Sequence, residues 1–133
     1  MGNDTKTQQK MLLADDSSSE RKDYKKMILE ALDIQIDEVN GGGELVKKAR
    51  EGGYVVIVTD YDMKYGDLGT DAIKRIREFD RTTPIILHTG GFIAPDMLDA
   101  GANHVLHKRS RNYMELTSLV TEYARKADDV RHE

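Results

Sequence analysis

The 133-residue sequence contains no cysteine, no tryptophan and only two prolines. The absence of cysteine excludes disulfides, thiolate zinc sites and cysteine nucleophiles. It also fits a reducing compartment, and we expect the protein in the cytoplasm. No stretch is apolar for long enough to span a bilayer, and the polar first ten residues have no signal-peptide core. We therefore expect no membrane association.

A surplus of positive charge is also missing. Lys and Arg number 20 against 24 Asp and Glu, for a formal net charge of −4. Binding to a nucleic-acid backbone needs a concentrated basic face, so we expect no nucleic-acid partner. Hydrophobic residues are 38% of the chain and charged residues 33%, which is typical of a globular protein. The length predicts one domain, which we place at residues 10–127 between polar tails at 1–9 and 128–133.

Short apolar runs alternate with segments of helical periodicity. The runs predict five strands, at residues 11–14, 34–39, 54–58, 84–87 and 104–107. The periodic segments predict five helices, around residues 24–32, 45–49, 72–79, 95–100 and 113–123, the fourth of them short. The uninterrupted β-branched run at 54–58 should be a central strand, whereas 34–39 alternates apolar and acidic residues as an edge strand does. This alternation predicts an α/β fold, a doubly wound five-stranded parallel sheet with helices on both faces.

Polar residues end four of the five predicted strands. In chain order they are Asp15 and Asp16, then Asp60 and Asp62, then Thr89, then Lys108. Ligands of such sheets bind outside the carboxyl ends of the strands, so these side chains should converge on one rim. Each residue alone has a plain structural explanation, such as a helix cap, a strand-end hydroxyl or a solvated charge. Their conjunction favours a site.

The chemistry of this set points to phosphoryl transfer. Clustered carboxylates raise each other's pKa unless a cation neutralises them, and oxygen-only ligands suit Mg²⁺. A metal ion, an ammonium group and a hydroxyl that lie side by side would together bind the oxygens of a phosphoryl group, which need both positive charge and hydrogen-bond donors. A carboxylate on the rim could then act as the nucleophile and form an aspartyl phosphate.

Four segments carry a resemblance to a known family. Residues 11–16 (MLLADD), 55–63 (VVIVTDYDM), 84–89 (PIILHT) and 99–108 (DAGANHVLHK) resemble the receiver domains of two-component response regulators, including chemotaxis response regulators. The resemblance covers nearly the whole chain. It implies a flavodoxin-like (βα)5 fold with strand order 2-1-3-4-5.

The resemblance also implies roles for the rim residues. Asp60 would be the phosphoacceptor, and Thr89 and Lys108 would contact the phosphoryl oxygens. Mg²⁺ would be held by Asp16 and Asp60, by the backbone carbonyl of Asp62, and by Asp15 through a water. The donor would be a phosphohistidine on a histidine kinase or a phosphotransfer protein, and the response would alter a face around the fourth and fifth helices. The domain would not be an enzyme beyond the gain and loss of its own phosphoryl group.

Some positions depart from the family pattern. Lys64 follows Met63 and Arg109 follows Lys108 where the family usually has proline, the second across a cis bond. Val105 stands where an aromatic switch residue is usual, and the span from Thr89 to Lys108 is shorter than usual. The chemistry should survive these changes, but the usual output route is in question. We therefore expect phosphorylation to act by ordering residues 90–98.

Two other functions stay open at this point. The Asp60 and Asp62 pair also resembles the motif of haloacid-dehalogenase-type phosphatases, although Asp15 and Asp16 then lie too early in the chain. A phosphorylation-independent interaction module is the other alternative.

Two further motifs predict no site. Gly41 to Gly43 lack the Lys-Ser/Thr of a phosphate-binding loop and predict a flexible turn. His104 and His107 should point to opposite faces of their strand, so a metal site that includes them and His88 is not expected.

Overall fold

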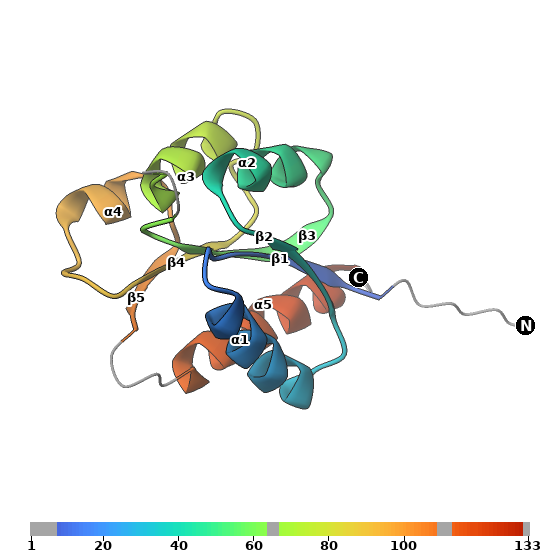
Figure 1. The fold of residues 1–133 in the computed structure, drawn as a ribbon. Helices are drawn as coiled ribbons and strands as arrows, with labels where there is room; N and C mark the ends of the chain where they lie inside the picture. Colours follow the sequence, from blue (N-terminus) through green and yellow to red (C-terminus); the bar gives the residue numbers. More distant parts are fainter. Residues whose placement is uncertain (1–7, 64–66, 109–112, 132–133) are drawn as a thin grey trace, which may run out of the picture.

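The computed structural model describes residues 8–63, 67–108 and 113–131. Strands and helices alternate along the chain as the sequence predicts (Figure 1). The strands are β1 (Lys10–Ala14), β2 (Gln35–Val39), β3 (Tyr54–Asp60), β4 (Ile85–Thr89) and β5 (His104–His107). The helices are α1 (Ser18–Ala31), α2 (Gly42–Glu51), α3 (Gly69–Arg77), α4 (Pro95–Asp99) and α5 (Met114–Arg131).

All neighbouring strands pair in parallel, in the order β2-β1-β3-β4-β5. The predicted strand order and the central place of β3 are therefore confirmed. The edge position of β2 agrees with its alternating sequence. Helices α2, α3 and α4 lie on one side of the sheet and α1 and α5 on the other (Figure 1).

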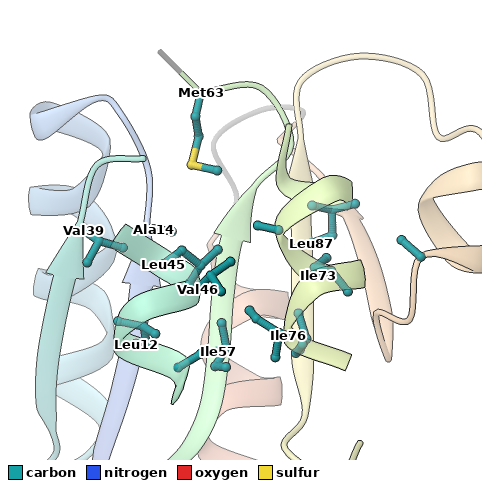
Figure 2. Packing of buried hydrophobic residues seen from close by; sticks show 14 of the residues in the cluster. Leu12, Ala14, Val39, Leu45, Val46, Ile57, Met63, Ile73, Ile76 and Leu87 are labelled. Carbon is teal, nitrogen blue, oxygen red and sulfur yellow. The ribbon is translucent and has the colours of Figure 1, made fainter. Parts of the chain in front are cut away.

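The core has two layers because both faces of the sheet are covered. Successive residues of β1 point to opposite faces, so Leu12 packs in the cluster with α2 and α3 while Leu13 packs in the cluster with α1 and α5. In the first cluster, Leu12 and Ile57 of the sheet meet Leu45 of α2 and Ile73 of α3 (Figure 2). These four side chains are fully buried, and truncating one of them to alanine would cost roughly 2–5 kcal/mol.

Helix α1 starts where its serines predict. The Oγ atom of Ser17 accepts a hydrogen bond from the backbone N–H of Glu20 at 3.2 Å, which caps the helix. This cap fixes the direction in which the chain leaves β1, and it places the first turn of α1 beside the carboxyl end of the sheet.

Two predictions about local structure are wrong. Gly41 is the N-cap of α2, and Gly42 and Gly43 form its first turn instead of a flexible turn. The Gly42 N–H donates to Asp67 Oδ2 at 3.0 Å, which holds the start of the helix in place. Helix α5 continues to Arg131, so the prediction of a polar tail that begins at residue 128 places the end of the helix too early.

The predictions for Lys64 and for the bond between Lys108 and Arg109 lie outside the described residues. Within the described ranges, none of the helices has the length and apolar character needed to cross a membrane.

Candidate functional site

Three aspartates meet where β1 and β3 end. These strands are neighbours in the sheet, with Ala14 opposite Thr59, so the residues that follow them are adjacent. Asp15, Asp16 and Asp60 each offer a carboxylate oxygen, and these oxygens all lie within 4.8 Å of one another. Asp15 and Asp60 are buried. The predicted convergence of acidic residues is confirmed.

Lys108 reaches this cluster from the end of β5. Its Nζ atom lies 3.1 Å from Asp60 Oδ1 and 3.4 Å from Asp15 Oδ2. A third carboxylate is closer, because Glu20 Oε2 accepts from Lys108 Nζ at 2.7 Å. The backbone N–H of Lys108 donates to Thr89 O at 2.7 Å and so ties the lysine to the end of β4.

Thr89 and Asp62 lie on the same cleft. The cleft has a volume of about 580 Å³ and is lined by residues from five segments: Glu20, Asp60, Tyr61, Asp62, Thr89, Gly90, Gly91, Phe92, Ala94, Met97 and Lys108. Thr89 is buried, and its Oγ atom accepts from the Gly91 N–H at 3.1 Å. All six residues that the sequence singles out therefore belong to the acidic cluster or line this cleft.

Gly69 lets the chain pass directly behind the end of β3. A Cβ atom at this position would lie 2.2 Å from the backbone oxygen of Asp60 and 2.9 Å from Leu87 Cδ1. The Gly69 N–H donates to Tyr61 O at 2.6 Å. Only glycine fits this close approach, which fixes the backbone on which Asp60 and Asp62 stand.

The cluster shifts the pKa of its members. Burial, together with the hydrogen bond to Glu20, raises the pKa of Asp15 to about 7, although the Ser17 N–H and Lys108 act to lower it. Burial also raises the pKa of Asp60, although the nearby Lys108 opposes that shift. Burial acts to lower the pKa of Lys108, but Glu20, Asp15 and Asp60 more than offset it, so the pKa is raised and the ammonium stays charged.

These residues fit a divalent cation. The donor set is three carboxylates without nitrogen or sulfur ligands, which suits the hard ion Mg²⁺ better than a transition metal. The raised pKa of buried Asp15 points the same way, because a cation would relieve the cost of holding these carboxylates ionised together. Coordination by the Asp62 backbone carbonyl stays a prediction.

Sequence reasoning missed Glu20. It lies in the first turn of α1, where the Ser17-x-x-Glu20 spacing is typical of a helix cap. That spacing signals the place of Glu20 near the rim, but not its contact with Lys108, which is 88 residues away along the chain.

The histidines do not form a metal site among the described residues, where the aspartate cluster is the only such group. His88 is buried on the α1 side, and its Nδ1 atom is 2.8 Å from the Tyr24 hydroxyl. Burial, with Lys108 nearby, lowers the pKa of His88 to about 4, so the ring is neutral near pH 7. His104 pairs with the Tyr123 hydroxyl at 2.7 Å.

The family model for the response regulator receiver domain matches residues 11–121. Among similar solved structures, the Francisella response regulator 1452 receiver domain is 25% identical, with a TM-score of 0.78 over 90% of this chain and 98% of that one. The chemotaxis protein CheY4 of Vibrio cholerae is 25% identical, with a TM-score of 0.72 over 85% and 97%. No curated protein matches the sequence significantly.

A third solved structure bears on the metal. The receiver domain of sensor histidine kinase PA1611 from Pseudomonas aeruginosa PAO1 is 27% identical, with a TM-score of 0.75 over 88% of this chain and 98% of that one. It carries a magnesium ion coordinated in its active site cleft. The family match covers most of the chain, agrees with the observed strand order, and disfavours the haloacid-dehalogenase alternative. The chain belongs to the response regulator receiver domain family.

Proposed function

We propose that this domain accepts a phosphoryl group on Asp60, in a Mg²⁺-dependent reaction with a phosphohistidine of a histidine kinase or a phosphotransfer protein. The observation that carries the proposal is the position of the Asp60 carboxylate. It is buried at the end of the central strand, 3.1 Å from Lys108 Nζ and within the cluster of three aspartates. The magnesium in the Pseudomonas receiver domain supports the proposed metal requirement.

The residues divide the chemistry among them. An Asp60 oxygen attacks the phosphorus and forms an O–P bond, while the P–N bond of the phosphohistidine breaks and its electron pair returns to the imidazole. Lys108 and Thr89 donate to the oxygens of the transferred group, whose charge needs such donors. When bound by Asp15, Asp16 and Asp60, Mg²⁺ would neutralise the charge of the carboxylates and of the phosphoryl oxygens.

The outcome we propose is a signal and not the turnover of a small molecule. Thr89 begins the segment that leads to α4, so a phosphoryl group that draws on its hydroxyl would alter residues 90–98 and the face around α4 and α5. A cytoplasmic location stays a prediction.

Intact mass after incubation with acetyl phosphate and Mg²⁺ tests the proposal. The wild type should gain one phosphoryl group, and Asp60→Asn should gain none. Asp62→Asn is the matched control, because it removes an exposed carboxylate from the same loop and should still be labelled. Equal labelling of Asp60→Asn and the wild type would refute the assignment.

A further inference from the structure

Glu20 is the third residue of α1, where a glutamate usually contributes to the helix cap. In a capping box, the glutamate in the third position of a helix bonds back to the N–H of the N-cap residue. Here the Ser17 N–H already donates to Asp15 Oδ1 at 2.9 Å. The Glu20 side chain is therefore not needed for the cap, and its Oε2 atom instead accepts from Lys108 Nζ at 2.7 Å.

This contact holds the lysine that the phosphoryl group needs. Of the three carboxylates around Lys108 Nζ, Glu20 is closest, ahead of Asp60 at 3.1 Å and Asp15 at 3.4 Å. Glu20 also lines the cleft together with Asp60 and Thr89. A phosphoryl oxygen on Asp60 would have to compete with Glu20 for the same ammonium protons.

Two of these carboxylates, Asp15 and Glu20, differ in how freely they can move away from Lys108. The Asp15 side chain is almost fully buried, whereas the Glu20 side chain is 36% exposed. The Glu20 carboxylate also lies at the end of a longer and more flexible side chain. Glu20 can therefore turn into solvent by giving up its contacts with Lys108 and Asp15, whereas Asp15 is held in the core. Glu20 also adds a negative charge to a cleft in which Lys108 and one divalent ion would balance the three aspartates, so it opposes the entry of an anionic group.

We infer that Glu20 is a positioning residue that holds Lys108 in the unphosphorylated state and thereby restrains the binding of a phosphoryl group at Asp60. The inference rests on the proposed function and names a control on that same site. Phosphorylation would require the Glu20 to Lys108 contact to open, so the surroundings of α1 set how readily the domain is switched on.

Glu20→Gln tests this restraint, because it keeps the size of the side chain and removes its charge. The probe is beryllofluoride, an anionic mimic of the phosphoryl group, titrated at saturating Mg²⁺ and followed by the fluorine NMR signal of the bound form. Glu20→Gln should bind beryllofluoride about fivefold more tightly than the wild type, the size expected for loss of a partly exposed ion pair. An unchanged or weaker affinity would overturn the inference, and a weaker one would point to a role in holding the metal.

Glu38→Gln is the matched control. The Glu38 side chain is 32% exposed and is paired with Arg21 and Lys25, but it lies away from the cleft. Its substitution should leave the affinity for beryllofluoride unchanged. If both variants tighten binding equally, the effect is only one of net charge and the inference is wrong.

A double-mutant cycle shows whether Glu20 acts through Lys108. The rate of labelling by acetyl phosphate, timed by intact mass, should rise about fivefold for Glu20→Gln in the wild-type background. The same change should have no effect in Lys108→Ala. An equal effect in both backgrounds would overturn the inference while leaving the proposed function intact. A wild type that neither binds beryllofluoride nor is labelled would remove both.

Discussion

The cleft is bordered by two regions of opposite character. On one side stands the acidic rim, in which Asp15 and Asp60 are 1% and 7% exposed at the ends of central strands. On the other side lies the segment of residues 90–98 after β4, in which Phe92 is 91% exposed. Helix α4 has only five residues, and α3 and α5 are both longer.

The difference shows where the domain can change. The rim is built from the core, so its geometry is fixed by strand pairing and by close contacts such as that of Gly69 with the Asp60 backbone. Residues 90–98 form few buried contacts, and segments of this kind open locally at low free energy. The geometry of the proposed chemistry is therefore held by the fold, while the segment that we propose carries the response can change its conformation more easily.

The metal at the rim should have a large effect on stability. A ligand that binds only the folded state at a hundred times its Kd adds about 2.7 kcal/mol to the free energy of unfolding. Mg²⁺ should therefore raise the melting temperature of the wild type and of Asp62→Asn, whose backbone carbonyl is unchanged. Asp16→Asn should respond far less. A flat response of the wild type would count against the metal site.

Substitution of Gly69 should lower the free energy of unfolding by displacing the backbone of Asp60. Gly69→Ala places a Cβ atom 2.2 Å from the Asp60 backbone oxygen, and overpacking of this kind costs about 2 kcal/mol. Gly43→Ala is the control, because a Cβ there meets no atom within 4 Å, so it should be neutral or stabilising. Urea unfolding of the two variants measures the difference. Equal stability of both would show that the rim is more adaptable than its packing indicates.

The pH dependence of stability should report the buried charge of Asp15. Its folded pKa is raised to about 7, above the value of 3.8 for an unperturbed aspartate, so the folded state holds a proton that the unfolded state has lost between these pH values. In EDTA this contribution is fully present below pH 3.8 and is lost as pH rises to about 7. Asp15→Asn should gain stability relative to the wild type by about 1 kcal/mol per pH unit across that window. A constant difference between the two proteins from pH 4.5 to 7 would contradict the raised pKa.

The smallest change in global stability should accompany the response itself. Because most of residues 90–98 are exposed and Val105 replaces the usual aromatic residue, we expect beryllofluoride to order this segment without a large movement at Val105. Hydrogen exchange should show new protection across residues 90–98 and little change in β5. Full protection of the segment before the mimic is added would contradict this prediction.

Local sequence patterns were sufficient for the strands and for the rim. The β-branched run of β3 and the carboxylates at the strand ends predict a central strand and a convergent site, since parallel strands end on one edge. The strand order needed the family resemblance, because apolar runs alone do not say which strands are neighbours.

The failures have physical reasons. Three glycines have low helix propensity, but at the start of α2 the first-turn N–H groups need no intrahelical partner, and the Gly42 N–H finds Asp67 instead. The contact of Glu20 with Lys108 and that of Tyr24 with His88 join residues 88 and 64 positions apart. Such pairs follow from the packing of α1 against the sheet, which no local pattern specifies.

The central claim is that Asp60 itself carries the phosphoryl group, and mapping of the modified residue tests it most directly. Borohydride reduces an aspartyl phosphate to homoserine, so the wild type is labelled with acetyl phosphate and Mg²⁺, reduced, digested and analysed by peptide mass spectrometry. We predict homoserine at position 60 and unchanged aspartate at positions 15, 16 and 62. Homoserine at any of those three positions, with Asp60 intact, would contradict the account.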